Sequence, residues 1–333
     1  MRIFFFVIII LLANFSFAQQ GFSETSVAPG TFSRMGFGPR GISLGNAAGA
    51  INKGNVNSYY NPALSVFQND NSFSSAYSFL GLDRSLNFVN FTRKFEFYSD
   101  KDSLIVPRKP RATAGISFGL INAGVSKIDG RDNQGFKKGD LSTSENQFFM
   151  AFANRFSDKF AAGIGIKFYY YKLYEDITST GLGFDIGAIY LLNPQLTIAF
   201  TISDLNAKYK WDTSPLFGTD GSTSENKFPM TKKISVSYFL GEPDIILAGE
   251  FEFNNMHNKL MRFGAEYKIF DYFQLRAGID NINISTTDSP IRPALGFGYT
   301  HQLGKINVGV DYAFAYEPYS PQSRHIAGIS ILF

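Results

Sequence analysis

The chain has 333 residues, and its 31 basic and 28 acidic side chains leave a formal net charge of +3. So small a surplus gives no electrostatic basis for a nucleic-acid partner. The sequence contains no cysteine, which excludes disulfides and thiolate metal sites. A composition of 36 Phe, 17 Tyr and 31 Gly with a mean hydropathy of −0.06 favours a chain whose apolar and polar side chains alternate.

Residues 1–18 predict a signal peptide that is cleaved on export. Arg2 supplies a short positive region, and residues 3–12 are uniformly apolar. The Ser-Phe-Ala sequence at 16–18 then forms a small-x-small cleavage site. The apolar run is too short to span a bilayer as a helix, so a membrane anchor is the weaker alternative.

Residues 19–70 differ from the rest of the chain. They are rich in Gly, Ala, Ser and Asn and show no sustained alternation. Residues 42–51 predict a short helix whose small side chains allow close packing. Asn61 and Pro62 indicate a turn, because a residue before proline avoids the helical region. We expect this segment to form a compact unit ahead of the strands.

From residue 71 onward, apolar and polar side chains alternate in long runs. In residues 261–269 the odd positions hold Met, Phe, Ala, Tyr and Ile, and the even positions hold Arg, Gly, Glu and Lys. About 14 such segments follow one another, with lengths near the 9–11 residues that a tilted membrane strand needs. They are residues 71–81, 85–98, 111–125, 145–157, 159–173, 181–192, 195–205, 231–240, 244–254, 259–270, 272–281, 291–302, 305–316 and 323–333.

Short and long connections alternate along nearly the whole chain. Tight turns are predicted at 157–159, 193–194, 241–243, Asp271 and Gly304, and polar loops at 126–144, 174–180, 206–230, 282–290 and 317–322. This pattern is typical of short periplasmic turns and long extracellular loops. Only 99–110 is long on the predicted periplasmic side. We therefore predict an all-β fold, a transmembrane antiparallel barrel over 71–333 in an outer membrane, with residues 19–70 as a hatch or plug in its lumen.

The polar faces of the predicted strands carry charges of both signs. If these face the lumen, burial without partners would cost several kcal/mol each, so we expect them to pair with one another or with the hatch. A selective solute pathway is the alternative. The charges are Lys167, Asp185, Glu250, Glu252, Arg262, Glu266, Lys268, Arg276, Asp280 and Asp311.

The chain ends on Phe333, an aromatic residue on an alternating strand. Such an ending resembles the signal that the outer-membrane barrel assembly machinery reads in its substrates. We expect Phe333 to be that signal.

Two glycine motifs in the hatch match enzyme patterns without the required context. Residues 36–41 (GFGPRG) fit a dinucleotide motif, but no strand precedes them and Pro39 removes a backbone donor. Residues 41–45 (GISLG) fit a nucleophile elbow, but no α/β sheet surrounds them. We interpret neither as a catalytic site.

Neither the histidines nor the acidic loop predicts a metal site. His257, His301 and His325 are far apart in sequence and lack metal-ligand spacing. A barrel-wall hydrolase would require a serine near His301 or His325. Residues 129–135 (DGRDNQG) have a broken calcium-loop pattern and are interpreted as a solvated turn. We therefore expect no enzyme activity, cofactor or metal.

Residues 34–46 (RMGFGPRGISLGN) and 57–67 (NSYYNPALSVF) resemble the N-terminal hatch of the PorV/PorQ family. In that family a glycine-rich arginine motif leads into a small-residue helix and then an aromatic-Asn-Pro-Ala turn. This chain has Tyr60 where the family usually has Trp, and it lacks the acidic pair that commonly precedes. The matching positions are Gly38, Arg40, Gly41, Leu44, Gly45, Ala47, Tyr60, Asn61, Pro62 and Ala63.

The resemblance implies a FadL-like barrel and a role in type IX secretion. Family members bind the secretion translocon or the surface attachment complex, and one branch receives the C-terminal domain of exported cargo. By fold, FadL relatives move hydrophobic molecules through a hatch and a lateral opening. Fold alone does not settle function.

Two functions are therefore carried forward. The first is a non-enzymatic scaffold that binds secretion partners through loops 126–144 and 206–230, with Tyr209, Lys210 and Trp211 as the candidate contact, because exposed aromatics anchor interfaces. The alternative place for Trp211 is the interfacial aromatic girdle. The second function is transport of small hydrophobic molecules, with Arg40 and the hatch as a gate.

Overall fold

The computed structural model describes residues 28–81, 84–98, 110–174, 176–285 and 289–333, so the predicted signal peptide lies outside the described residues. The strands are β1 (Ser72–Phe79), β2 (Arg84–Phe97), β3 (Ala112–Arg131), β4 (Lys137–Arg155), β5 (Phe160–Tyr174), β6 (Ile177–Leu191), β7 (Leu196–Leu205), β8 (Lys208–Asp212), β9 (Thr223–Lys227), β10 (Thr231–Leu240), β11 (Ile245–Asn254), β12 (Lys259–Phe270), β13 (Phe273–Asn283), β14 (Arg292–Leu303), β15 (Ile306–Ala315) and β16 (Arg324–Leu332). The helical turns are η2 (Thr31–Arg34), α2 (Pro39–Ser43), η3 (Pro62–Phe67), α3 (Ser214–Phe217) and η5 (Gly218–Asp220). In the part of the chain that the structure describes, no helix is long and apolar enough to cross a membrane.

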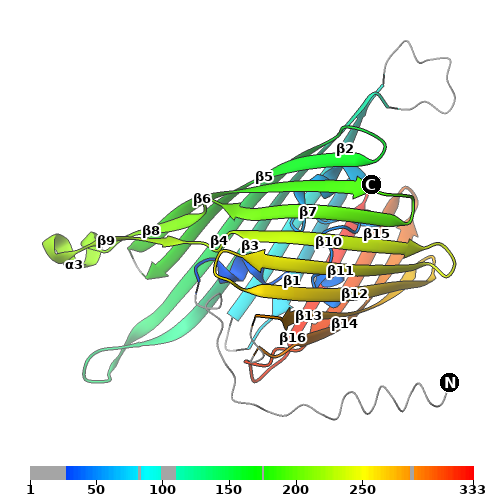
Figure 1. Cartoon of the computed structure of the whole chain (residues 1–333). Helices are drawn as coiled ribbons and strands as arrows, with labels where there is room; N and C mark the ends of the chain where they lie inside the picture. Colours follow the sequence, from blue (N-terminus) through cyan, green and yellow to red (C-terminus); the bar gives the residue numbers. More distant parts are fainter. Residues whose placement is uncertain (1–27, 82–83, 99–109, 175, 286–288) are drawn as a thin grey trace.

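All strands except β8 and β9 form one closed antiparallel barrel, in which each strand pairs with its sequence neighbours (Figure 1). The ring closes between β1 and β16, where Ser72 stands opposite Leu332. Beside this pair, Asn71 and Phe333 exchange two backbone hydrogen bonds of 3.0 Å. Closure satisfies the strand edges, which is what a sheet surrounded by hydrocarbon requires. The predicted barrel of about 14 strands is confirmed.

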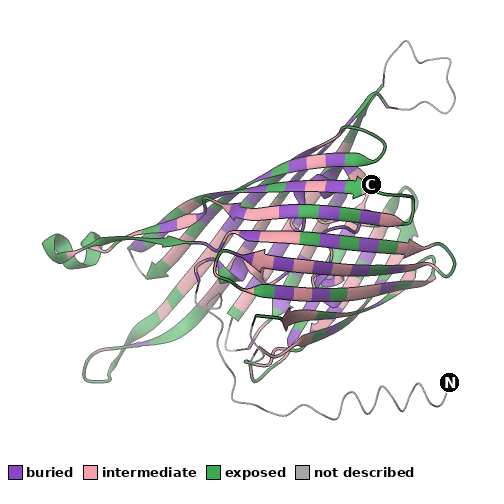
Figure 2. Cartoon of the chain, viewed as in Figure 1, coloured by how far each residue is buried: buried purple, intermediate pink, exposed green. Residues whose placement is uncertain are grey.

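Burial alternates along much of the barrel wall, so purple or pink bands alternate with green ones along several of the front strands (Figure 2). On β5, Ile164, Ile166 and Phe168 face outward and are exposed, whereas Lys167 between them and Tyr169 after them are buried. The exposed large side chains along the neighbouring strands are likewise mostly aromatic or aliphatic. An apolar outer surface of this extent fits hydrocarbon and not water.

Two predicted loops contain regular structure. The loop predicted at 126–144 is wrong, because β3 and β4 continue through it as a hairpin whose tip lies at 132–136. The loop predicted at 206–230 holds the β8–β9 hairpin, which carries α3 beyond the rim of the barrel (Figure 1). The β3–β4 hairpin is mostly polar on both faces, so period-two hydrophobicity does not reveal it. In β8 the aromatic residues Tyr209 and Trp211 do alternate with polar ones, but the strand has only 5 residues.

Of the predicted hatch at 19–70, residues 28–70 are described, and they lie inside the barrel. The helix predicted over 42–51 is wrong, because α2 covers only Pro39–Ser43. Pro39 stands in the first turn, where its missing N–H costs nothing. Gly45 and Asn46, with φ of 61° and 62°, then turn the chain out of the helix.

The hatch rests directly on glycines of the wall, through its backbone at four of them and through short side chains at the others. A Cβ atom placed at Gly278 would lie 2.2 Å from the backbone nitrogen of Gly45, so only glycine fits there. The hatch segment 39–45 meets one such group of wall glycines and the segment 61–66 meets another. The first group is Gly264, Gly278, Gly296 and Gly328, and the second is Gly115, Gly163 and Gly187. These two seats set the depth of the hatch in the lumen.

Candidate functional site: the lumen around the hatch

Charged side chains hold one side of the hatch to the wall. The Arg40 guanidinium donates to both carboxylate oxygens of Glu266, at 2.8 and 2.7 Å. It also donates to the backbone carbonyls of Lys53 and Asn55 within the hatch. Arg276 of β13 shares Glu266 at 2.7 Å. Because removing one member of a buried pair costs about 3–5 kcal/mol, this contact is a firm anchor.

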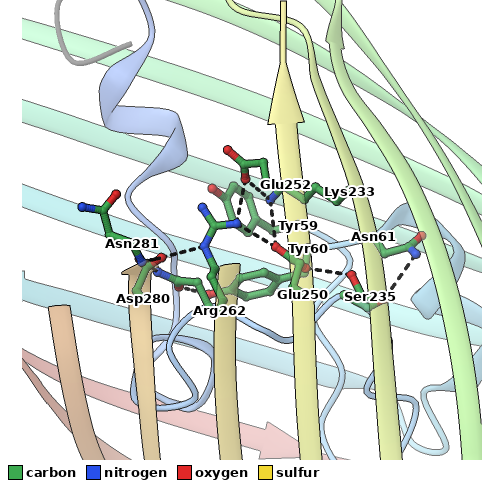
Figure 3. Close-up of polar contacts among 12 residues, drawn as sticks. Tyr59, Tyr60, Asn61, Lys233, Ser235, Glu250, Glu252, Arg262, Asp280 and Asn281 are labelled. Carbon is green, nitrogen blue, oxygen red and sulfur yellow. Dashed lines mark hydrogen bonds and ion pairs between the residues drawn. The ribbon is translucent and has the colours of Figure 1, made fainter. Parts of the chain in front are cut away.

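A second ion-pair network lies beside the first (Figure 3). Arg262 of β12 donates to Glu250 at 2.9 Å, Glu252 at 2.7 Å and Asp280 at 2.6 Å. Asp280 also accepts a hydrogen bond of 2.8 Å from Asn46 of the hatch. The lumenal charges therefore pair with each other and with the hatch, which confirms the predicted interior rather than an open charged pathway.

A third charged cluster fills the wall at a bulge between β6 and β7. Lys167 contacts Asp185 at 2.8 Å and Asp204 at 3.0 Å, and all three side chains are buried. The Tyr169 hydroxyl donates to Asp204 at 2.6 Å. These contacts fix Tyr169 on the inner wall, where its ring faces the lumen contents.

The side of the lumen formed by β2–β5 is aromatic instead. The rings come from three places, namely the wall, the hatch and the β8–β9 hairpin, and together we name them the aromatic column. Neighbouring centroids lie between 4.7 and 6.5 Å apart. The column comprises Phe88, Phe149, Tyr169 and Tyr171 of the wall, Phe32, Phe37 and Tyr59 of the hatch, and Tyr209, Trp211 and Phe228 of the hairpin and its base.

The column leads from the rim to a cavity of about 410 Å³. Its outer end is Trp211, which packs edge-on against Tyr171 at 5.2 Å. At its inner end Phe37 and Phe88 belong to the lining of the cavity. That lining includes residues near the start of β1 and the end of β16, which places the cavity in the half of the barrel nearer the chain ends.

The two sides of the hatch thus differ in what holds them. In the described part of the chain, no ion pair joins the hatch to β2–β5, and rings fill that boundary in its outer half. Separation of a buried ion pair costs much free energy, because each partner is left as an uncompensated charge. Packed rings can change rotamer without exposing a charge. The boundary between the hatch and the aromatic side of the wall is therefore the one that opens at the lower free-energy cost.

Comparison with solved structures agrees with this geometry. The hydrocarbon channel CymD covers 90% of this chain and 98% of its own, with 14% identity and a TM-score of 0.59. The toluene transporter TbuX of Ralstonia pickettii covers 89% and 97%, with 12% identity and a TM-score of 0.59. A FadL homologue of Pseudomonas aeruginosa covers 89% and 97%, with 12% identity and a TM-score of 0.54. The fold is a FadL-like barrel.

Sequence-level comparisons add nothing to this. No family model matches the chain, and no curated protein matches it either. At 12–14% identity the solved structures establish the FadL-like fold alone. A function for this lumen must therefore be argued from the chain's own residues.

The FadL-like barrel brings the predicted hatch residues together. Gly41 lies against the ring of Tyr60, where a Cβ would come within 2.5 Å of the ring carbons. The Tyr60 hydroxyl donates to Asn46 at 2.8 Å. Burial raises the pKa of this hydroxyl well above its ordinary value, so Tyr60 remains a neutral donor. The motif therefore holds the hatch in shape.

The remaining motif residues have positions of the same kind. Gly38, with a φ of 75°, precedes α2, and Leu44 is fully buried beside the wall glycines. Asn61 is fully buried and accepts a 3.0 Å hydrogen bond from the Ala63 N–H, which starts η3 at Pro62. The wall partners of the hatch were not predicted as site residues. The sequence feature that could have identified these wall residues is their charge at lumen-facing positions of the strands.

The candidate partner-binding residues lie at the base of the hairpin. Tyr209 is 1% exposed and Trp211 is partly buried, whereas Lys210 points to solvent. A partner that approaches this hairpin meets Lys210 first. Tyr209 and Trp211 close the outer end of the lumen.

The histidines do not form a site with a serine among the described contacts. His325 shares a hydrogen bond of 2.6 Å with the Tyr312 hydroxyl, and His301 stacks on Tyr299. His257 lies in the turn between β11 and β12 with a φ of 58°. Within the described ranges no cluster of three or more His, Asp or Glu residues is placed to hold a metal ion.

Proposed function

We propose that this protein lies in the outer membrane and admits small, predominantly apolar molecules along the aromatic column. The observation that carries the proposal is the division of the lumen into an ion-paired side and an aromatic side. Molecules that move along the column meet ring faces from Trp211 to the cavity beside Phe37. Stacking on aromatic rings stabilises an apolar guest without any demand for hydrogen bonds.

Under this proposal the hatch stays in place while molecules pass. Its seats on the wall glycines and its contact with Glu266 remain, and only rings on the other side change rotamer. Side-chain rotamer changes are far faster than domain displacements. The names of the similar structures support the proposal, since CymD is described as a monoaromatic hydrocarbon channel and TbuX as a toluene transporter.

The test is the uptake of radiolabelled ethylbenzene by Gram-negative cells that lack their own channels of this type. Cells that express the protein should take it up faster than cells with an empty vector. Ile121→Asn places a second amide in the column, opposite Gln147, and should slow ethylbenzene uptake severalfold. A hydrocarbon that passes between two amides separates them without making a hydrogen bond to either, which costs about 1–3 kcal/mol.

Ile189→Asn is the matched control. Ile189 is as deeply buried as Ile121, at 1% and 0% exposure, but it packs on η3 outside the column. Equal uptake by the wild type and Ile121→Asn, or equal slowing by both variants at equal protein level, would refute passage along the column.

A second function, a scaffold for secretion partners as implied by the PorV/PorQ resemblance, has one structural observation in its favour. The β8–β9 hairpin projects past the rim, and Leu216 and Phe217 at its tip are 41% and 62% exposed (Figure 1). Affinity purification from native membranes tests it. Recovery of translocon, attachment-complex or cargo proteins with the wild type, and not with Leu216→Ser/Phe217→Ser, would support the scaffold. Recovery of none of these proteins would refute the scaffold function.

A further inference from the structure

The aromatic column carries hydrogen-bonding groups that its packing leaves unused. Gln147 of β4 is fully buried, and neither its amide oxygen nor its amide nitrogen has a partner among the described residues. The hydroxyl of Tyr209, a residue that is 1% exposed, likewise has no hydrogen-bond partner among the described residues. One carboxylate oxygen of Glu145 is also buried without a partner. Native interiors satisfy more than nine in ten such groups, so three together need an explanation.

These groups border the same part of the column. Gln147 stands opposite Ile121 and Tyr169 in the two strand ladders, and Glu145 stands opposite Tyr171. The Tyr209 ring packs on both tyrosines, at 6.3 Å from Tyr169 and 5.5 Å from Tyr171. An amide that can both donate and accept therefore lies among rings near the outer end of the path.

The inner end of the path is polar as well. The cavity lining holds four cationic and four acidic side chains, so its charge balances, and amide and hydroxyl groups fill the space between them. The charged members are Arg40, Lys53, Lys268, Arg276, Asp70, Asp244, Glu266 and Asp311.

The cations of this lining are already engaged. Arg40 and Arg276 pair with Glu266, and the Lys53 ammonium lies 3.3 Å from the centroid of the Phe239 ring. Burial lowers the pKa of Lys53, and Asp244 partly offsets that shift. A pure hydrocarbon that enters this cavity gains no contact to replace the water it displaces from polar groups.

From these two ends we infer that the preferred guest is a small aromatic or apolar molecule that bears an uncharged hydrogen-bonding group, such as a hydroxyl. This inference rests on the proposed passage along the column and names the class of molecule. An anionic group is disfavoured, because Arg40 and Arg276 of the lining already pair with Glu266. The Gln147 amide and the Tyr209 hydroxyl are the residues that set the preference.

The hairpin covers these groups in the structure, so a guest reaches them only when β8 moves. Tyr209 and Trp211 stand on β8, which is outside the barrel ladder and is tied to β6 through the Ser179 hydroxyl. That hydroxyl accepts from the Lys210 N–H at 2.9 Å and donates to the Lys210 carbonyl at 2.7 Å. A movement of β8 at these two bonds opens the column end while every barrel strand keeps both neighbours.

The chain provides its own probe, because Trp211 is its single tryptophan. The purified protein in lipid nanodiscs is titrated with benzyl alcohol and with ethylbenzene, which match in size and differ in the hydroxyl, while Trp211 emission is recorded. The readout is the ratio of the two dissociation constants. Comparison of this ratio between variants removes the difference in partition into lipid.

Gln147→Leu should shift the ratio of dissociation constants about tenfold in favour of ethylbenzene. The reason is that the variant can no longer form the hydrogen bond between the buried amide and the hydroxyl of benzyl alcohol. Tyr209→Phe, which removes only the hydroxyl, should shift it in the same direction. Gln195→Leu, in an exposed turn at the other end of the barrel, should leave it unchanged.

The outcomes separate this inference from the proposed function. If both molecules change Trp211 emission and neither variant alters the ratio, the column admits apolar guests and the preference for a hydroxyl is wrong. If neither molecule changes the emission and ethylbenzene uptake also fails, the proposed function itself is wrong.

Discussion

Glu266 is the residue through which the hatch, β12 and β13 are held together, since Arg40 and Arg276 both donate to it. Glu266→Gln should leave two buried guanidinium groups with too little negative charge, at a cost of about 3–5 kcal/mol. Because the barrel ladder is intact, we expect the hatch to shift and the ion conductance in planar bilayers to rise. Lys137→Ala removes an exposed ion pair with Asp140 and should not change the conductance. Unchanged conductance in Glu266→Gln would show that the anchor is dispensable.

At the scale of single residues, the sequence predicted which residues shape the hatch but not which wall residues they contact. Arg40, Tyr60 and Asn61 were recognised from the hatch motif, because small residues and an Asn-Pro turn leave a local pattern. The wall partner of Arg40, which is Glu266, and that of Asn46, which is Asp280, lie more than two hundred residues away in the chain. Only closure of the barrel brings them together. Likewise, the unpaired amide of Gln147 follows from what surrounds it and not from its neighbours in sequence.

At the scale of single elements, the hatch segments pack closely on the wall strands because glycines leave room for them. Gly278→Ala should force the hatch off its seat, since the added Cβ would lie 2.2 Å from Gly45 and overpacking costs about 1–3 kcal/mol. Trypsin should then cleave the hatch at Arg40 or Lys53 about tenfold faster, while the barrel keeps its heat-sensitive migration on gels. Gly249→Ala, whose Cβ would have its nearest neighbour at 3.6 Å, is the control and should resist trypsin as the wild type does.

The β8–β9 hairpin is an element that covers the lumen without belonging to the wall. Replacement of residues 207–228 by a short Gly-Ser linker should remove Trp211 and Tyr209 from the column and leave the barrel folded. We expect ion conductance to stay closed, because the hatch still fills the lumen, and ethylbenzene uptake to rise. If ion conductance opens, the hairpin and not the hatch closes the lumen to ions.

For the whole molecule, alternation of side chains was enough to predict a closed barrel and nearly all of its strands, because lipid and lumen impose opposite demands on neighbouring residues. The β3–β4 hairpin escaped this signal because it is mostly polar on both faces, and the β8–β9 hairpin escaped it because its strands have only 5 residues each. The early helix was misplaced because Gly45 and Asn46 adopt positive φ, which composition alone does not reveal.

The strand pair that closes the barrel depends on the last residue. Phe333 exchanges two backbone hydrogen bonds with Asn71 and is 52% exposed on the outer wall. Deletion of Phe333 should lower the amount of folded protein in outer membranes several-fold, as measured by immunoblots of unheated samples. Phe333→Tyr keeps the aromatic ring and should assemble normally. Normal assembly of the deletion would show that the terminal aromatic is not a signal.

The seating of the hatch has a consequence for biogenesis. Its backbone meets wall glycines on β3 and β5 as well as on β12 and β13, so it is enclosed on opposite sides. A segment that fits this closely is hard to insert through either mouth once the ring is complete. We therefore expect the N-terminal residues to lie along the nascent sheet before the first and last strands meet, so that the barrel closes around the hatch.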